Sequence, residues 1–416
     1  MEDIKAKVEE KDTCRKELEI TVPSEKMEAE LARTYREIGK GRKIKGFRPG
    51  RAPRAVLEKY FSAEAHDLVI KNQVKRAYFE IIRREKLEVV GEPEFNEITW
   101  SGKGPLEFTV SVEVAPPVEL KNYRGIRLKK TSIEVEDKEV DATLEALRER
   151  SASFEAVEKD AVESGDWVEL EYKEPGGGED GWKPAGPIEI REEDERLGAQ
   201  MLGMKPEEVR AIATGPDGSG EELEVRFTEI KKKVLPPLND ELARLWGKYE
   251  NLDEIKDQIK EDIRARKEIQ ARRALEGQVK DFLIKKNQIP LPPGLLEDTA
   301  KEYLKREQAA VNQNPSAEKE ISEEKLKEKA RDRAAEDLSF MFMLEEIARR
   351  EEVKVDPADV AAEIRRMAGQ RGADPAAFQR ELESSGKIAV LEDRLRRAGA
   401  LEFLIDNAKI KEGAPS

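Results

Sequence analysis

Two pairs of prolines, Pro116–Pro117 and Pro236–Pro237, separate stretches of this 416-residue chain whose apolar residues follow different periods. Proline has no backbone N–H to donate and fixes its own φ, so neither a helix nor a central strand continues through such a pair. The chain is long enough for several domains. We therefore predict a multidomain α+β protein, with a small α+β part, a β-rich middle part and an extended all-α C-terminal part that carries arms.

The first part combines the periods of strands and helices. Apolar and polar residues alternate over residues 18–22, whereas apolar residues recur every three or four positions over residues 27–38. A similar helical period follows from residue 54, and a second alternating run begins at Leu106. In order, we expect a strand over 18–22, a helix that Ser24 caps and that ends at Gly39 and Gly41, a helix over about 54–86 with a break near Ser62, and a strand over 106–114.

The middle and C-terminal parts differ sharply in composition. Residues 154–231 are rich in glycine and contain two runs typical of strands, which indicates a β-rich insert of a size usual for a domain. After Pro237, apolar residues recur at spacings of three or four between charged ones, without a sustained heptad pattern. The further elements expected are an extended piece over 125–135, a helix from Asp137, strands over 167–172 and 223–230, and helices from Leu242 and over about 317–350, 357–368, 375–383 and 388–410.

A basic run interrupts the first part. Residues 39–59 carry eight Lys or Arg against one acid, in a chain whose formal net charge is −14. Within the run Phe47 is followed closely by Pro49 and Gly50, which predicts that no helix continues there. The planar guanidinium groups of arginine are well shaped to donate hydrogen bonds to carboxylates or RNA phosphates. We expect an exposed basic tip that bears Phe47; the alternative is a solvated charged face with Phe47 folded into the core.

The run Gly46–Pro53 resembles the ribosome-docking signature of the trigger factor family of bacterial chaperones: Gly-Phe-Arg, any residue, Gly, a basic residue, any residue, Pro. Residues 249–254 and 289–292 are similar to that family too, as is the order of the three parts. The resemblance implies that the ribosome-binding residues are Gly46, Phe47, Arg48, Gly50, Arg51 and Pro53. It implies a ribosome-binding domain over 1–115, a discontinuous helical chaperone domain over 116–149 and 232–416, and an FKBP-like peptidyl-prolyl isomerase domain over 150–231.

The insert departs from the family in the segments that would form a prolyl pocket. Residues 165–172 and 202–206 resemble FKBP-like elements, but the Ile-Pro-Gly step before the second is missing. The loop between Thr214 and Leu223 is short and has no aromatic residue. Tyr172 and Trp182 could line a pocket, or they could be ordinary core residues. We therefore expect weak or absent isomerase activity, and we assign no catalytic residue.

The resemblance also implies partners. It predicts a chaperone that holds unfolded nascent polypeptides at the ribosomal exit tunnel, where a ribosomal protein and rRNA would be contacted, and it leaves a homodimer of the free protein open. Phe340, Met341, Phe342 and Met343 are candidates for client binding, because consecutive apolar residues point all round a helix; the alternative is that they are buried between arms. Two other functions stay open: the same chaperone with a working isomerase, and a basic-loop RNA-binding protein, which the negative charge disfavours.

Few residues offer metal or redox chemistry. Cys14 is the only cysteine and His66 the only histidine, so neither an internal disulfide nor a Cys/His zinc site can form. The N-terminus is polar and charged, and no window approaches 18 uninterrupted apolar residues. We expect a cytoplasmic protein without a membrane partner, a metal or another cofactor.

Overall fold

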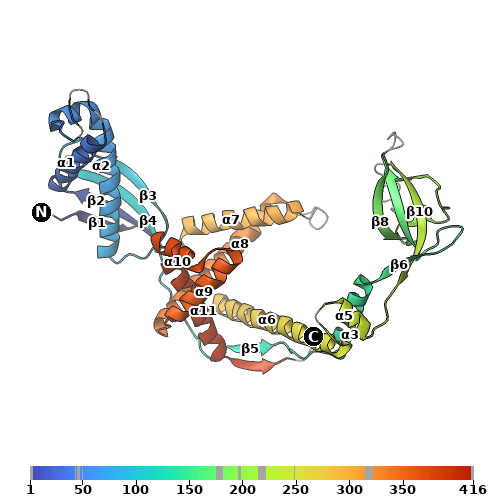
Figure 1. Ribbon diagram of the computed structural model, residues 1–416. Helices are drawn as coiled ribbons and strands as arrows, with labels where there is room; N and C mark the ends of the chain where they lie inside the picture. The colour runs from blue at the N-terminus through green and yellow to red at the C-terminus, as the bar shows by residue number, and fades with distance from the viewer. Residues whose placement is uncertain are drawn as a thin grey trace. The chain divides into compact units, whose positions relative to one another are not determined.

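The structure is a computed structural model of the chain. The described residues are 3–42, 44, 47–48, 50–174, 181–194, 198–213, 222–247, 249–313 and 322–413, without the side chains of 310–313. The chain forms two compact units, one of Met1–Lys130 with Arg273–Glu412 and the other mainly of Thr131–Arg272. Each unit contains both helices and strands, and Figure 1 labels most of them.

The N-terminal part of the first unit is an antiparallel sheet covered by two helices. The strands lie in the order β1-β2-β4-β3, and helices α1 and α2 pack on one face of the sheet (Figure 1). Inward positions of β4 alternate with more exposed ones, which is the pattern expected for a sheet with one buried face. The bounds are β1 Lys5–Glu10, β2 Arg15–Val22, α1 Ser24–Gly41, α2 Arg54–Arg84, β3 Val89–Thr99 and β4 Leu106–Val114.

Helices α1 and α2 and strands β2 and β4 agree with the periods in the sequence, whereas β1 and β3 were not predicted, and one expected cap is wrong. All four apolar residues that define the face of α1 are buried, and each such side chain stabilises the core by about 1.5–3 kcal/mol. Helix α2 has non-helical backbone angles at Phe61, one residue before the expected break. The cap expected at Ser24 is wrong: Ser24 is already the first helical residue, and Pro23, which has no hydroxyl, occupies the N-cap.

The rest of the first unit is mostly helical. Two apolar cores hold it together, one around the C-terminal half of α6 with α8 and α11, and one among α9, α10 and α11. The bounds are α6 Leu252–Lys286, α7 Pro293–Gln313, α8 Glu323–Arg350, α9 Pro357–Arg371, α10 Pro375–Ser384 and α11 Lys387–Asp406. The helix expected over 388–410 ends early: β11 (Lys409–Glu412) pairs in parallel with β5 (Arg127–Lys130), which lies about 280 residues earlier in the sequence.

The second unit combines a β-rich region with a helical base. Its five-stranded sheet has the order β6-β10-β7-β8, with β9 also paired to β10, around one apolar core. A separate core joins α3, α5 and the first half of α6. The bounds are α3 Asp137–Arg150, β6 Ser153–Ala156, β7 Trp167–Lys173, β8 Lys183–Glu189, α4 Gly198–Met201, β9 Arg210–Ala213, β10 Glu222–Val234 and α5 Asp240–Leu245. The short loop expected between Thr214 and Leu223 lies outside the described residues except for Glu222, which is the first residue of β10.

None of the helices in the described part of the chain is both long enough and apolar enough to span a bilayer.

A buried carboxylate joins the sheet of the first unit to helix α7. Glu113, on β4, is only 8% exposed and accepts hydrogen bonds from the backbone amides of Gly294 at 2.7 Å and Leu295 at 2.9 Å. These amides belong to the first turn of α7, which has no intrahelical acceptors for them and which attracts negative charge. A Cβ added at Gly294 would lie 3.0 Å from a Glu113 carboxylate oxygen. The glycine therefore allows the carboxylate to approach the helix.

Gly294→Ala is expected to destabilise the protein by about 1–3 kcal/mol, because the new methyl group overpacks this contact. The measurement is the urea midpoint of the full-length protein. Gly277→Ala is the matched control: Gly277 is inside α6, and an added Cβ there meets nothing within 4 Å. This control should be neutral or stabilising by up to about 1 kcal/mol. Equal midpoints for the two variants would contradict a tight Glu113 contact.

Candidate functional site: the basic tip

The basic tip, residues 42–53, connects two closely packed helices. Gly39, near the end of α1, faces Leu57 in the first turn of α2, and a Cβ built on the glycine would lie 3.2 Å from the leucine side chain. Tyr35 and Leu57 are both buried, so the helices that flank the tip rest on the core. Burial raises the pKa of Tyr35, an effect that Glu58 reinforces and Arg54 opposes. The tip therefore begins and ends on rigid supports.

Backbone hydrogen bonds shape the tip. The Phe47 amide donates to the Ile44 carbonyl at 3.1 Å, and the Arg51 amide donates to the Arg48 carbonyl at 2.9 Å. The Gly50 amide donates back to the Gly39 carbonyl at 2.8 Å. Gly50 has a φ of +78°, which only glycine adopts without steric cost. Gly50 is therefore needed for the turn that closes the tip.

Phe47 is solvent-exposed, with 39% of its surface accessible. Arg48, Gly50, Arg51 and Pro53 are exposed too, whereas Gly46 lies outside the described residues. The alternative in which Phe47 folds into the core is therefore not found. Two apolar residues pack on the core in its place, Ile44 and Ala52. Sequence reasoning missed these anchors, although their position as the apolar residues on either side of Phe47 was a usable signal.

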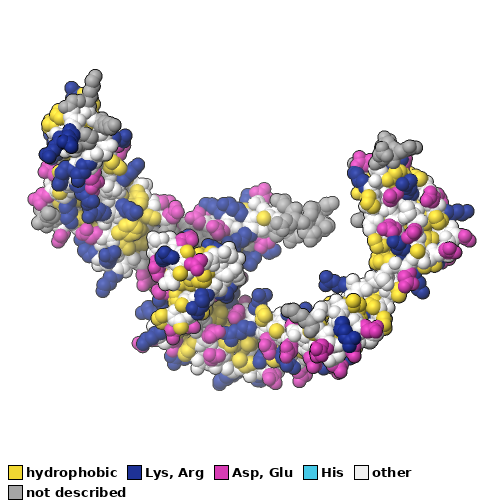
Figure 2. Space-filling model, viewed as in Figure 1, with side chains coloured by type: hydrophobic (Ala, Val, Ile, Leu, Met, Phe, Trp, Pro, Cys, Tyr) yellow, Lys and Arg dark blue, Asp and Glu magenta, His cyan; other side chains and the backbone are white. Residues whose placement is uncertain are grey.

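The arginines in and next to the tip differ in their partners. Arg42 pairs with Glu64 at 2.8 Å and Arg54 pairs with Glu58 at 2.7 Å, so both are neutralised locally. Within the described part of the chain, Arg48 and Arg51 have no acidic partner. Figure 2 shows Lys and Arg side chains gathered over α1 and α2. Among the described residues of the tip, two guanidinium groups without acidic partners and a phenyl ring are thus exposed.

The candidate prolyl-pocket residues do not share a face of their sheet. Tyr172 packs against the core together with the inward residues of β7. Trp182 instead contacts Lys173, whose Nζ lies 4.8 Å from the ring centre, and Arg226, whose Cζ lies 4.2 Å from it. Because side chains alternate along a strand, Lys173 points away from the face that holds Tyr172. The two aromatic rings are therefore not brought together, and cations cover the Trp182 ring.

The apolar run of α8 is largely buried. Phe342 is 3% exposed and Met343 is fully buried, whereas Phe340 and Met341 are half-buried. Phe340 and Met343 pack in the core that α8 shares with α6 and α11. For Phe342 and Met343 the structure thus favours the alternative of a core position over a surface for clients.

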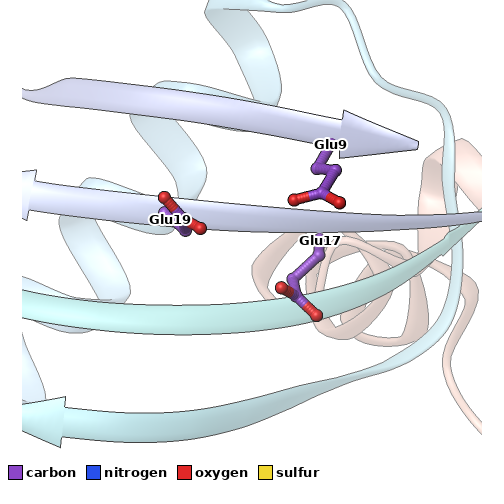
Figure 3. A group of neighbouring side chains, drawn as sticks. All are labelled: Glu9, Glu17 and Glu19. Atoms are coloured by element: carbon purple, nitrogen blue, oxygen red, sulfur yellow. The ribbon is translucent and has the colours of Figure 1, made fainter. Parts of the chain in front are cut away.

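Three carboxylates gather on the exposed face of the sheet, Glu9 on β1 and Glu17 and Glu19 on β2 (Figure 3). Lys11 Nζ lies 3.2 Å from Glu9 and 3.3 Å from Glu17, and Lys7 Nζ lies 3.4 Å from Glu19. Hydrogen bonds to Glu9 and Glu17 raise the pKa of Lys11. Two lysines pair with the three carboxylates, so the cluster is an ordinary surface ion-pair network.

Comparisons with known proteins agree along most of the chain. The family described as bacterial trigger factor protein (TF) matches residues 4–147, and its C-terminal counterpart matches residues 251–406. Proteins named trigger factor from Solibacter usitatus and Caldicellulosiruptor bescii are 26% and 29% identical to this chain. The first match covers 95% of this chain and 97% of its relative, and the second covers 97% of both.

A solved structure is also similar. Its title is "Promiscuous Substrate Recognition in Folding and Assembly Activities of the Trigger Factor Chaperone". It is 21% identical, with a TM-score of 0.49, over 97% of this chain and 99% of that one.

Proposed function

We infer that this chain, which belongs to the trigger factor family of ribosome-associated chaperones, reaches the ribosome through its basic tip. The observation that carries the proposal is the exposure of Phe47 beside two arginines, Arg48 and Arg51, without acidic partners among the described residues. The turn that presents them is held by backbone hydrogen bonds on both sides of Arg48. Little conformational entropy therefore has to be lost when the tip binds.

The chemistry of the tip suits a mixed protein and RNA surface. Guanidinium groups bind carboxylates and phosphates in a bidentate manner, and Phe47 supplies an apolar anchor of the kind that dominates binding energy. We propose that Gly46, Phe47, Arg48, Gly50, Arg51 and Pro53 contact a ribosomal protein and rRNA at the exit tunnel. Phosphate contacts make such binding weaker as salt increases. Co-sedimentation with ribosomes over a range of salt concentrations is the direct test.

Packing supports a discontinuous helical domain. Val140 and Leu144 of α3 share a core with Ile255 and Ile259 of α6, although more than 100 residues separate these helices in sequence. The β-rich region between them has a core of its own. We propose a ribosome-binding domain over 1–115, a helical chaperone domain over 116–149 and 232–416, and an FKBP-like domain over 150–231. In the helical domain, Phe340 and Met341 keep part of their surface available for unfolded nascent chains.

We further propose that isomerase activity is weak or absent. A prolyl ring needs an open aromatic surface, yet Lys173 and Arg226 lie on the Trp182 ring, and Arg226 also donates to the Glu171 carboxylate at 2.7 Å. Proline isomerisation in a short peptide should therefore stay near its uncatalysed time of about 10–100 s at 25 °C. The measurement is a peptide isomerisation assay with an active trigger factor as the positive control.

Trp182→Ala is expected to leave the rate of proline isomerisation in the short peptide unchanged. A rate matching the active relative, reduced by Trp182→Ala, would show that the insert is a working isomerase.

A further inference from the structure

A second basic feature lies on α2, away from the tip. It is a surface groove of about 660 Å³, which we call the α2 groove. Four cations and one acid line it together with a single phenyl ring, in a chain whose net charge is strongly negative. The lining residues are Lys75, Arg76, Phe79, Glu80, Arg83 and Arg84.

The helical spacing places the cations on both sides of the ring. Lys75 and Arg76 come about one turn before Phe79, and Arg83 and Arg84 come about one turn after it. At 1.5 Å per residue, the two pairs of cations are separated along the axis by about 12 Å. The groove is therefore a line of positive charge with an aromatic ring at its centre.

Part of this charge is free to bind a ligand. Lys75 and Arg83 have no acidic partner among the described residues. Arg76 pairs with Glu30 at 3.3 Å, and Arg84 pairs with Glu85 at 3.1 Å and donates to the Ile4 carbonyl at 2.8 Å. These two cations are held in place by the domain itself.

The one acid in the groove is balanced. Glu80 lies 4.0 Å from Lys26 on α1, so its charge does not cancel that of the free cations. The groove therefore keeps a net positive charge, which favours an anionic ligand.

The phenyl ring is exposed although its neighbour is buried. Phe79 is 53% exposed, whereas Tyr78 is 7% exposed. The Tyr78 ring meets Phe79 edge-on at 5.2 Å between centroids, and it meets Phe95 at 5.5 Å. The Phe79 ring thus has one aromatic neighbour in the domain, while more than half of its surface stays in water. Such a ring is suited to stack on a planar ligand.

We propose that the α2 groove binds single-stranded RNA, with Lys75 and Arg83 on its phosphates and Phe79 stacked on a base. Basic grooves with aromatic platforms are the general means by which proteins hold single strands without sequence preference. Only one of the six lining residues is apolar, so the groove itself lacks the apolar centre of a protein interface. This site is separate from the tip, and the proposal goes beyond ribosome docking.

The test uses the full-length protein and a short fluorescein-labelled polyuridine RNA, with fluorescence anisotropy at several low salt concentrations. The parent protein should bind saturably. Phe79→Ala and Phe79→Leu should each weaken binding about tenfold, because stacking on one base is lost, whereas Phe79→Trp should retain it. Lys75→Glu with Arg83→Glu should weaken binding further than loss of the ring alone does. The milder Lys75→Ala with Arg83→Ala should lower the slope of log affinity against log salt by about 1.4.

Lys325→Glu with Arg331→Glu is the matched control, because it makes the same charge change on exposed positions of α8. It should leave RNA binding unchanged. Circular dichroism should show that every variant is folded. Absence of saturable binding by the parent, or equal loss in the control pair, would overturn the proposal. So would equally tight binding of polyglutamate, which would identify the groove as a site for acidic peptides.

The proposals for the tip and for the α2 groove can be refuted independently of each other. Failure of the tip variant to lose ribosome binding counts against the tip alone, since the RNA measurement needs no ribosome. Loss of RNA binding in the Phe79 variants with normal ribosome binding supports a separate α2 groove.

Discussion

Replacing Phe47 and Arg48 together by alanine is expected to abolish co-sedimentation of the protein with ribosomes at moderate salt. Exposed aromatic and arginine anchors each contribute about 2 kcal/mol or more to an interface, so the double variant should bind roughly a thousandfold more weakly. Neither side chain belongs to the core of the N-terminal domain, and the tip is anchored by Ile44 and Ala52. The circular dichroism spectrum and thermal midpoint should therefore match those of the parent protein.

The control for this experiment is Arg54→Ala with Tyr60→Ala. It also removes one arginine and one exposed aromatic ring, close to the tip on α2, but Arg54 is already paired with Glu58. We expect at most a small loss of co-sedimentation. If the two double variants lost binding equally, a diffuse basic surface and not the tip would be the ribosome contact. A tip variant that still sedimented with ribosomes would contradict the proposal outright.

Met343→Ala is expected to destabilise the helical part of the first unit by about 2–5 kcal/mol, the usual cost of emptying a fully buried site. Met343 has no exposed surface and packs with residues of α6 and α11. Met341→Ala, two positions earlier on the same helix, should cost less than about 1 kcal/mol, because this side chain is only half-buried. Urea unfolding of the full-length variants gives both values.

The same pair of variants separates a core role from a client-binding role. Suppression of the aggregation of an unfolded client, measured where both variants are folded, should be unaffected by Met343→Ala. If Met343→Ala weakened client binding while the urea midpoint stayed unchanged, the side chain would have to reach the client, and the buried position would be wrong.

Local periods in the sequence predicted most helices and strands of the N-terminal part, because burial on one face is encoded in the spacing of apolar residues. The strand over 106–114 and the apolar face of α1 are examples. The C-terminal strand β11 could not be predicted in this way, because it depends on pairing with β5, about 280 residues earlier. Four residues carry too weak a pattern to oppose the helical period that precedes them.

For the candidate sites, the sequence was sufficient where chain geometry is local. Glycine and proline around Phe47 predict a turn, and the turn exposes the basic tip wherever the rest of the chain lies. The sequence was insufficient where the site depends on which face of a sheet each side chain occupies. Tyr172 and Trp182 are ten residues apart, yet the pairing of β7 with β10 decides that cations cover one ring while the other faces the core.

The α2 groove illustrates the same division. The order Lys75, Arg76, Phe79, Arg83, Arg84 is visible in the sequence, but Tyr78 and Phe79 are adjacent aromatic residues and either could face the core. Packing of α2 on the sheet buries Tyr78 and leaves Phe79 in solvent. Local steric restrictions on the backbone thus made the exposed tip predictable from the sequence alone. Only tertiary packing decided which aromatic rings stay exposed, because burial depends on surfaces that distant segments supply.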